Sequence, residues 1–348
     1  MTNHRAIPYT CNIEDLLKRL AAKKEQLDKL RPLPKELEQS LDSWLGVEFT
    51  YSSNAIEGNI LTRIETAEVL ERGVAAVIKG KQLKDQLEAL NHAKALEFIK
   101  TQSRILKSHQ YITEEKIKAI HKIILAGIND EWAGKYRETE VFIRGFNVDL
   151  PQPKKVPYMM AEFEQWLQGI EEHAVRVAAD AHYKFVAIHP FVDGNGRTAR
   201  LLMNLILLIH GYPMAIIHNE ERTQYLEILN AAQTKGNLEP FYTMVATAVE
   251  RTLDAYINAV QGKPVLSNLI PTSPKTNKLL RIGELAKETG ETIHAIRHWV
   301  EKGLVEVAEH TGVGYQLFDR SMIERVREIR RLQKEERLSI AEIKRRLA

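Results

Sequence analysis

Apolar residues recur at helical spacing along most of the chain. Over residues 13–30, lysines occupy one face and four leucines the other: Leu16, Leu17, Leu20 and Leu27. Similar patterns predict helices at 35–45, 63–70, 83–101, 113–126, 160–173, 175–188 and 197–209. We therefore expect a mainly α-helical fold.

One long stretch, residues 132–157, lacks helical spacing. Three prolines exclude long helices there: Pro151, Pro153 and Pro157. Within this stretch, the apolar residues from Val141 to Gly145 predict a short β-hairpin or edge strand.

Residues 262–277 contain three prolines and several Ser, Thr and Asn residues without periodicity, which predicts a linker. The expected organisation is an N-terminal helical region (1–110), a core (111–261), this linker and a C-terminal module (278–348).

The composition is that of a globular protein, and Cys11 is the one cysteine among 348 residues. An intrachain disulfide and a cysteine-based zinc site are therefore excluded, which fits a reducing compartment. The first fifteen residues have no apolar secretion signal, and the longest apolar run, 201–209, is too short to span a membrane. We expect a cytoplasmic protein and a buried helix at 201–209.

The net charge of +3 lies in the C-terminal module. Residues 278–348 hold 15 Lys and Arg against 12 Asp and Glu, whereas the rest of the chain is balanced. A nucleic-acid surface should therefore be sought in this module.

The segment from His189 to Arg200 lies between two predicted helices and reads His-Pro-Phe-Val-Asp-Gly-Asn-Gly-Arg-Thr-Ala-Arg. Gly194 and Gly196 allow the backbone to turn its N–H groups inward, at the start of a helix whose dipole also attracts anions. Arg197, three residues before Arg200, reaches the same side. Together these features predict a phosphate site.

The same segment carries acid–base and metal-binding groups. Asp193 offers the oxygen ligand that Mg²⁺ prefers, and His189 can take a proton from a hydroxyl. Each feature alone is more often a helix end, a turn or a solvated face. All of them in this order favour phosphoryl or nucleotidyl transfer.

This segment resembles the signature of the Fic family, His-Pro-Phe-x-(Asp/Glu)-Gly-Asn-Gly-Arg-x-x-Arg, at every fixed position. A weaker similarity covers about residues 40–260, including those from Gly134 to Arg137. The resemblance implies a Fic-type helical bundle. It also implies transfer of AMP from ATP to a hydroxyl of a target protein or of the enzyme itself.

The resemblance implies roles for individual residues. His189 is the general base, Asp193 holds Mg²⁺, and the segment from Val141 to Gly145 is the flap that aligns the target protein. The implied ATP ligands are Gly194, Asn195 and Gly196 for the phosphates, with Arg197 and Arg200 for the β- and γ-phosphates. For adenine we expect Tyr225, Leu226 and Gln233, the alternative being that these residues only pack their own helix.

A second segment, from Ser53 to Asn59, resembles the family's inhibitory motif (Ser/Thr)-x-x-x-Glu-(Gly/Asn). Ser53 and Glu57 would share one helical face, and Gly58 suits a helix end. The resemblance implies that Glu57 pairs with Arg200 in place of the ATP γ-phosphate. The alternative is a surface glutamate near a helix end.

The C-terminal module predicts two helices joined by a glycine turn (281–290 and 291–302), a wing (310–319) and a basic helix (321–333). The basic helix carries four arginines: Arg325, Arg327, Arg330 and Arg331. This order resembles the winged helix of MerR-type regulators. Gln316 stands where that family usually has arginine, so contact with DNA and contact with protein both stay open.

The expected protein is thus an autoinhibited protein adenylyltransferase that uses ATP and Mg²⁺. One alternative is a DNA-binding regulator whose Fic domain senses ATP, and another is an enzyme that removes AMP. The target protein and the oligomeric state stay open; a two-fold arrangement on DNA would need a homodimer formed by the Fic part.

Overall fold

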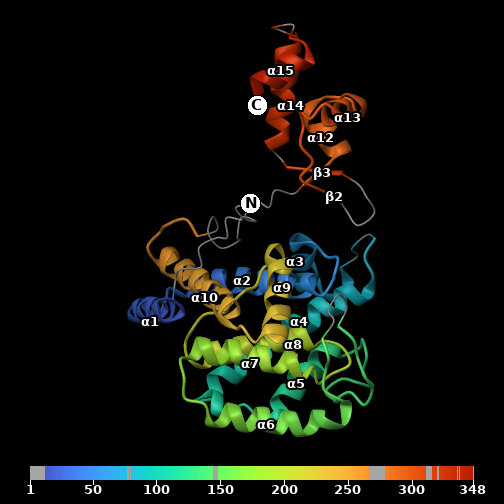
Figure 1. The fold of residues 1–348 in the computed structure, drawn as a ribbon. Helices are drawn as coiled ribbons and strands as arrows, with labels where there is room; N and C mark the ends of the chain where they lie inside the picture. Colours follow the sequence, from blue (N-terminus) through green and yellow to red (C-terminus); the bar gives the residue numbers. More distant parts are fainter. Residues whose placement is uncertain are drawn as a thin grey trace. The chain divides into compact units, whose positions relative to one another are not determined.

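The computed structural model describes residues 12–76, 78, 80–143, 148–265, 279–310, 316–319, 321–334, 336 and 338–347. The contacts divide the chain into two compact units, Met1–Pro271 and Thr272–Ala348. Figure 1 shows the elements of both, and each unit is described by itself.

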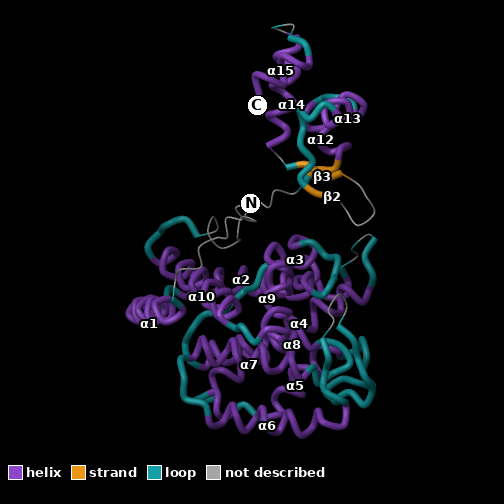
Figure 2. The backbone as a smooth tube through the Cα atoms, in the orientation of Figure 1, coloured by secondary structure: helices purple, strands orange, loops and turns teal. Residues whose placement is uncertain are grey.

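The described residues of the first unit form helices joined by loops (Figure 2). In chain order the helices are α1 (Ile13–Leu30), α2 (Lys35–Ile56), α3 (Arg63–Arg72), η1 (Gly73–Ala75), α4 (Leu83–Ile105), η2 (His109–Tyr111), α5 (Glu114–Leu125), η3 (Pro153–Lys155), α6 (Val156–Gly169), α7 (Ala174–Ile188), α8 (Asn195–Ile209), η4 (Asn219–Glu221), α9 (Arg222–Lys235) and α10 (Glu239–Val260). The expected mainly α-helical fold is confirmed.

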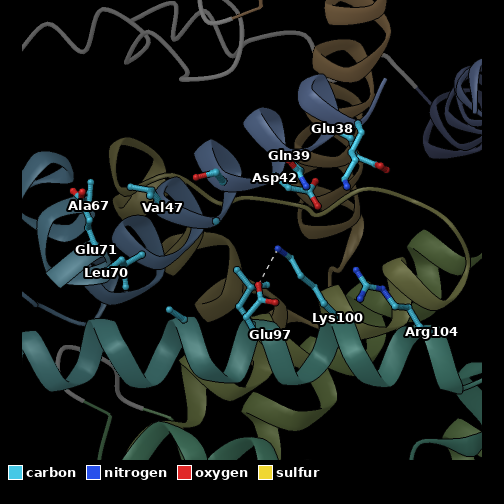
Figure 3. A pocket seen from close by; sticks show the side chains of 15 residues that line it. Glu38, Gln39, Asp42, Val47, Ala67, Leu70, Glu71, Glu97, Lys100 and Arg104 are labelled. Atoms are coloured by element: carbon cyan, nitrogen blue, oxygen red, sulfur yellow. Dashed lines mark hydrogen bonds and ion pairs between the residues drawn. The ribbon is translucent and has the colours of Figure 1, made fainter. Parts of the chain in front are cut away.

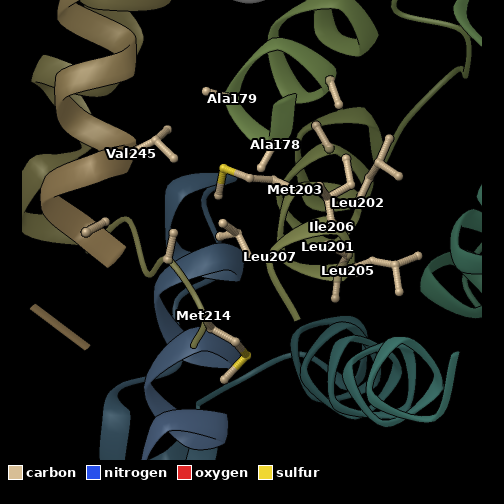
Figure 4. Packing of buried hydrophobic residues seen from close by; sticks show 14 of the residues in the cluster. Ala178, Ala179, Leu201, Leu202, Met203, Leu205, Ile206, Leu207, Met214 and Val245 are labelled. Atoms are coloured by element: carbon tan, nitrogen blue, oxygen red, sulfur yellow. The ribbon is translucent and has the colours of Figure 1, made fainter. Parts of the chain in front are cut away.

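Helix α8 lies at the centre of this unit and packs against α7, α4 and α5. Residues from Asn195 to Leu207 are buried almost without interruption, and polar residues such as Arg200 and Asn204 are buried with the apolar ones. Figure 4 shows Met203 and Leu207 of α8 in the same core as Ala178 of α7 and Val245 of α10. The predicted buried helix is confirmed, and its first turn carries the candidate catalytic loop.

Helix α2 continues to Ile56 instead of ending near residue 45. Leu45, Phe49 and Ile56 are buried apolar residues of this helix, but buried polar side chains interrupt the apolar repeat between them: Thr50, Ser52, Ser53 and Asn54. These polar residues interrupt the apolar pattern from which the helix was predicted. Ser52 and Asn54 bond within α2, whereas Thr50 and Ser53 have partners on other helices, His92 and Arg200.

Helix α6 begins at Val156 and contains Pro157 in its first turn. Proline is tolerated there because the first N–H groups of a helix have no partner inside it. The prediction, which treated Pro157 as a barrier and placed the helix at 160–173, was therefore displaced toward the C-terminus.

Residues 141–143 form a loop, so the strand expected from Val141 onward is not present in its described part. The remainder of that expected hairpin, Arg144 and Gly145, lies outside the described residues. No described residue pairs with this segment as a strand, which leaves Val141, Phe142 and Ile143 without a sheet.

The described residues of the second unit contain a small antiparallel sheet and four helices. The elements are β1 (Leu280–Arg281), α12 (Ile282–Thr289), α13 (Ile293–Glu301), β2 (Glu309–His310), β3 (Gln316–Phe318), α14 (Ser321–Lys334) and α15 (Ile340–Leu347). The strand order is β1-β3-β2, with Leu280 opposite Phe318 and Glu309 opposite Leu317. Gly290 (φ 71°) turns the chain from α12 into α13, as helix-turn-helix spacing predicts.

A cavity of about 910 Å³ lies between α2, α3 and α4 in the first unit. Figure 3 shows charged side chains along it, among them Glu38, Asp42, Lys100 and Arg104. None of its lining residues belongs to the loop from His189 to Arg200, so size alone does not identify the reactive site.

Candidate active site

His189 ends helix α7 in a left-handed backbone conformation, with φ 50° and ψ 59°. This conformation is uncommon for a residue with a side chain, so neighbouring groups must hold it. Arg137 does so: its Nε donates to the carbonyl oxygen of His189 at 2.8 Å, and its backbone N–H donates to the carbonyl of Pro190 at 2.9 Å. The segment that ends at Arg137 therefore shapes the start of the loop.

The His189 imidazole is set up to accept a proton. Its Nδ1 lies 3.3 Å from the carbonyl oxygen of Val186, so Nδ1 carries the hydrogen and Nε2 is left as the acceptor. Burial, the largest influence, lowers the pKa of His189 to about 4. The ring is therefore neutral at pH 7, as a general base must be.

The loop is closed by its own asparagine. The Asn195 side chain donates to the carbonyl oxygen of Phe191 at 2.8 Å and accepts from the Phe191 N–H at 3.0 Å. Asn195 is 3% exposed. Both ends of its amide are thus engaged within the loop, which differs from the phosphate contact expected of this side chain.

His121 of α5 supports the loop from behind. Its ring stacks on Phe191, with centroids 3.6 Å apart. Its Nε2 donates to the carbonyl of Asp193 at 2.9 Å, and its Nδ1 accepts from the Gly134 N–H at 2.9 Å. The sequence offered no signal for this role, because a single histidine on a helix is usually an ordinary core residue.

A carboxylate lies against the first turn of α8, where the sequence predicts an anion cradle. Gly194, the residue before the helix, has φ 76°, which favours glycine. A Cβ atom on Gly196 would overlap Glu57 Oε1. The Glu57 carboxylate therefore lies at the helix N-terminus, where partial positive charge stabilises an anion.

Arg200 is 1% exposed, and residues of the segment from Ser53 to Asn59 contact it directly. Its Nη2 donates to Glu57 Oε1 at 2.7 Å and to the Ser53 carbonyl at 2.8 Å, while its Nε donates to Ser53 Oγ at 3.0 Å. Its Nη1 donates to the Tyr225 hydroxyl at 3.3 Å. The predicted Glu57–Arg200 contact is present, with Ser53 as part of the same arrangement.

Arg197 does not share this position. Its side chain is 2% exposed, with Nη1 at 3.2 Å from Glu88 Oε1 and Nη2 at 3.7 Å from Asp193 Oδ2. It is not among the residues that line the cavity next to His189. Of the two arginines expected to bind phosphate, the structure places Arg200 at this cavity and Arg197 against Glu88 of α4.

The cavity beside His189 has a volume of about 100 Å³. Its walls include the three residues predicted for adenine, Tyr225, Leu226 and Gln233, together with Ile143, Val186, Leu229 and Asn230, which the sequence did not single out. Nucleotide-sized ligands occupy pockets of about 300 Å³ or more. With Glu57 in place the cavity is smaller than this range.

Tyr225 has a second function in this wall. It is 2% exposed, and its hydroxyl bonds both Arg200 and the Nε2 of His182, the latter at 2.9 Å. The residue therefore holds the Arg200 guanidinium as well as lining the cavity.

Asp193 is the candidate metal ligand of the loop. Its side chain is 55% exposed, and its Oδ1 accepts the Gly194 N–H at 2.6 Å. The described residues contain no group of three or more acidic, histidine or cysteine side chains able to hold a metal ion. A single carboxylate suits Mg²⁺ that takes its other ligands from phosphates and water.

Comparison with known proteins gives the family. Residues 111–207 match the model of the Fic/DOC family. The solved structure of a Fic domain containing signaling protein from Bacteroides thetaiotaomicron is 31% identical, with a TM-score of 0.62 over 72% of this chain and 99% of that chain. The chain belongs to the Fic/DOC family. Fic-1 from C. elegans is also similar, 31% identical with a TM-score of 0.62 over 71% of each chain.

Curated relatives of this Fic-family chain carry the name Protein adenylyltransferase Fic. The relative from Culex quinquefasciatus is 34% identical over 79% of this chain and 54% of its own length. The relative from Nematostella vectensis is 39% identical over 62% of this chain and 49% of its own length. The chain thus spans about half the length of these relatives.

Residues 280–348 match the model of MerR HTH family regulatory proteins, so the Fic domain is followed by a second recognised module. In that module Ile293, His294, Arg297 and His298 lie on the exposed side of α13, whereas Trp299 is buried. Separately, no helix among the described residues combines the length and the apolarity that crossing a membrane requires.

The arginines of α14 are engaged within the second unit. Arg327 pairs with Glu324 at 2.6 Å, and Arg331 pairs with Glu328 at 2.7 Å. Arg330 pairs with Glu291. The helix is basic in sequence, but its described glutamate pairs reduce the positive charge that it presents.

Proposed function

We propose that this Fic-family protein transfers AMP from ATP to a hydroxyl group of a target protein or of itself. The observation that carries the proposal is the neutral imidazole of His189 beside an anion cradle and Arg200, all around one cavity. Nucleotidyl transfer requires a general base, a site for the phosphates and a cation that stabilises their charge, and these three groups can supply them.

In the proposed reaction, Nε2 of His189 takes the proton of the acceptor hydroxyl. The hydroxyl oxygen forms a bond to the α-phosphorus of ATP while the bond to the leaving pyrophosphate breaks. The N–H groups at the start of α8 and the Arg200 guanidinium hold the phosphates. Mg²⁺, held by Asp193, would neutralise phosphate charge when bound.

We infer that Glu57 inhibits this reaction. Its carboxylate occupies the cradle and one face of Arg200, the two features that an ATP phosphate would need. A phosphate that approached would meet like charge and a cation that already has a partner. The small cavity supports the same inference.

We further propose that the segment from Val141 to Gly145 receives the target protein. Phe142 is 91% exposed, and Ile143 lines the cavity beside His189. An extended target segment that pairs with this loop would bring its hydroxyl toward the base. The loop conformation of residues 141–143 without a target is compatible with strand pairing on binding.

The test is intact-mass analysis of the Glu57→Gly protein after incubation with ATP and Mg²⁺. We expect covalent AMP on the variant and at least about tenfold less on the wild type, because removing the carboxylate frees the cradle and Arg200. The Glu57→Gly, His189→Ala double variant is the control and should stay unmodified. Equal labelling of wild type and Glu57→Gly would contradict the inhibitory role.

The matched MerR module favours a second candidate, a DNA-binding regulator whose Fic domain senses ATP. A further alternative is removal of AMP, with Glu57 orienting a water molecule. Incubating AMP-modified protein with the wild type separates this last activity from transfer: release of AMP would support removal, and retention would exclude it.

A further inference from the structure

The turn that follows Glu57 is anchored to helix α4 by Asn59. The Asn59 Nδ2 donates to the carbonyl oxygen of Asp85 at 2.9 Å and to Glu88 Oε2 at 2.9 Å. Only Gly58, with φ 99°, separates Asn59 from Glu57. Two residues of chain span at most about 7 Å, so an anchor that holds Asn59 against α4 also limits how far the Glu57 backbone can move.

The other oxygen of the same carboxylate faces the catalytic loop. Glu88 Oε1 lies 3.2 Å from Arg197 Nη1, and the two side chains are 12% and 2% exposed. Lys84 is also near Oε1, but at 3.8 Å and with a side chain that is 59% exposed. The Glu88–Arg197 pair is therefore mostly withdrawn from water, where each charge depends on the other.

Arg197 has few alternatives to Glu88. Its Nε and Nη1 are buried and have no hydrogen-bond partner among the described residues. Its other ion-pair partner in that part of the chain, Asp193, is farther away at 3.7 Å, and the Asp193 side chain is 55% exposed. Glu88 is therefore the nearer and better-buried ion-pair partner of Arg197, which lies on the first turn of α8.

We propose that Glu88 is a positioning residue that couples the inhibitory segment to the catalytic loop. We call this arrangement, Asn59–Glu88–Arg197, the Glu88 bridge. Through it one carboxylate contacts both the turn that follows Glu57 and the first turn of α8. The inference rests on the proposed function. It adds that inhibition by Glu57 depends on Asn59, and that the rate supported by the loop from His189 to Arg200 depends on the carboxylate of Glu88.

The first experiment measures ATP affinity by calorimetry, with Mg²⁺ present. The proteins are the wild type, Asn59→Ala, Glu57→Gly and the double variant. We expect Asn59→Ala to tighten ATP binding at least about threefold while Glu57 is present, and to have no effect once Glu57 is removed. This non-additivity would not arise from a merely structural loss at Asn59.

The second experiment measures AMP transfer in the Glu57→Gly background. Glu88→Gln should lower kcat about tenfold, because the neutral amide leaves the Arg197 charge without its nearer partner. Glu88→Asp keeps the charge and should recover part of the rate. The matched control is Glu97→Gln on the same helix, which should leave kcat unchanged because the Glu97 side chain is 71% exposed and pairs with Lys100 at the surface.

Two results would overturn the inference. One is an ATP affinity that Asn59→Ala leaves unchanged, or changes equally with and without Glu57. The other is equal loss of rate in Glu88→Gln and Glu97→Gln. If Glu57→Gly binds ATP but transfers no AMP, the proposed function fails. The affinity measurements still decide whether Asn59 helps Glu57 to oppose ATP binding.

Discussion

His189 leads to an expectation about pH at the scale of a single residue. Because burial lowers its pKa to about 4, the ring stays in its basic form well below neutral pH. We expect kcat/KM for AMP transfer by Glu57→Gly to change less than about threefold between pH 8 and 5.5, whereas a histidine of ordinary pKa would lose about tenfold. Initial rates over this pH range test it.

The control for this measurement is the circular dichroism of the same protein at each pH, since partial unfolding would also lower the rate. His189→Ala should be inactive throughout. A tenfold decline between pH 7.5 and 5.5 in a fully folded protein would contradict the neutral, buried base.

Single residues also show where sequence reasoning stops. The loop signature predicts roles for His189 and Arg200, and the segment from Ser53 to Asn59 predicts the contact of Glu57 with Arg200, which the structure contains. The loop signature does not distinguish the surroundings of Arg197 from those of Arg200, since both residues lie on the first turns of α8. Burial against Glu88, far away in sequence, separates them, and no local pattern records that.

At the scale of elements, α13 is the helix that the DNA-binding alternative predicts to contact DNA. Arg297 lies on its exposed side, whereas Arg331 of α14 pairs with Glu328 at 2.7 Å. Arg297→Ala should weaken binding of duplex DNA and reduce the salt slope by about 1, with a smaller effect from Arg331→Ala as the matched control. Gel shifts of the full chain at two salt concentrations measure both.

Salt-insensitive binding, or the absence of binding, would remove the DNA-binding alternative and favour protein contact through this module. Equal weakening by the two variants would contradict the assignment of α13 as the contacting helix.

Helices with an uninterrupted apolar stripe were predictable, and α1 has the same bounds in sequence and structure. Helix α2 was predicted too short because its C-terminal half buries polar residues, one of which, Ser53, bonds Arg200 of another helix. The expected strand from Val141 failed in its described residues because β-propensity alone provides no pairing partner. Tertiary contacts decided both cases.

At the scale of the whole molecule, each unit has its own hydrophobic core. One is built around α8, and the other contains Leu285, Ile296, Trp299 and Phe318. Because the two cores share no described residue, we expect calorimetry to resolve two unfolding transitions. Limited proteolysis is an independent check, and it should cut first within the linker that the sequence predicts at 262–277. A single transition at every scan rate would contradict the separation of the two cores.

The first unit should also be the acid-sensitive one. Burial, the largest influence, lowers the pKa of His121 to about 4 and that of His182 to about 3. Below their ordinary pKa of about 6.5, the unfolded chain binds protons that the folded unit does not, so stability is complete above that pH and falls as pH decreases toward 4. Each histidine then lowers the free energy of unfolding by up to about 1.4 kcal/mol per pH unit.

Calorimetry between pH 7.5 and 5 should show the unfolding transition of the first unit move to lower temperature, and His182→Gln should reduce this shift. A transition temperature that is independent of pH would contradict the neutral state of these buried rings.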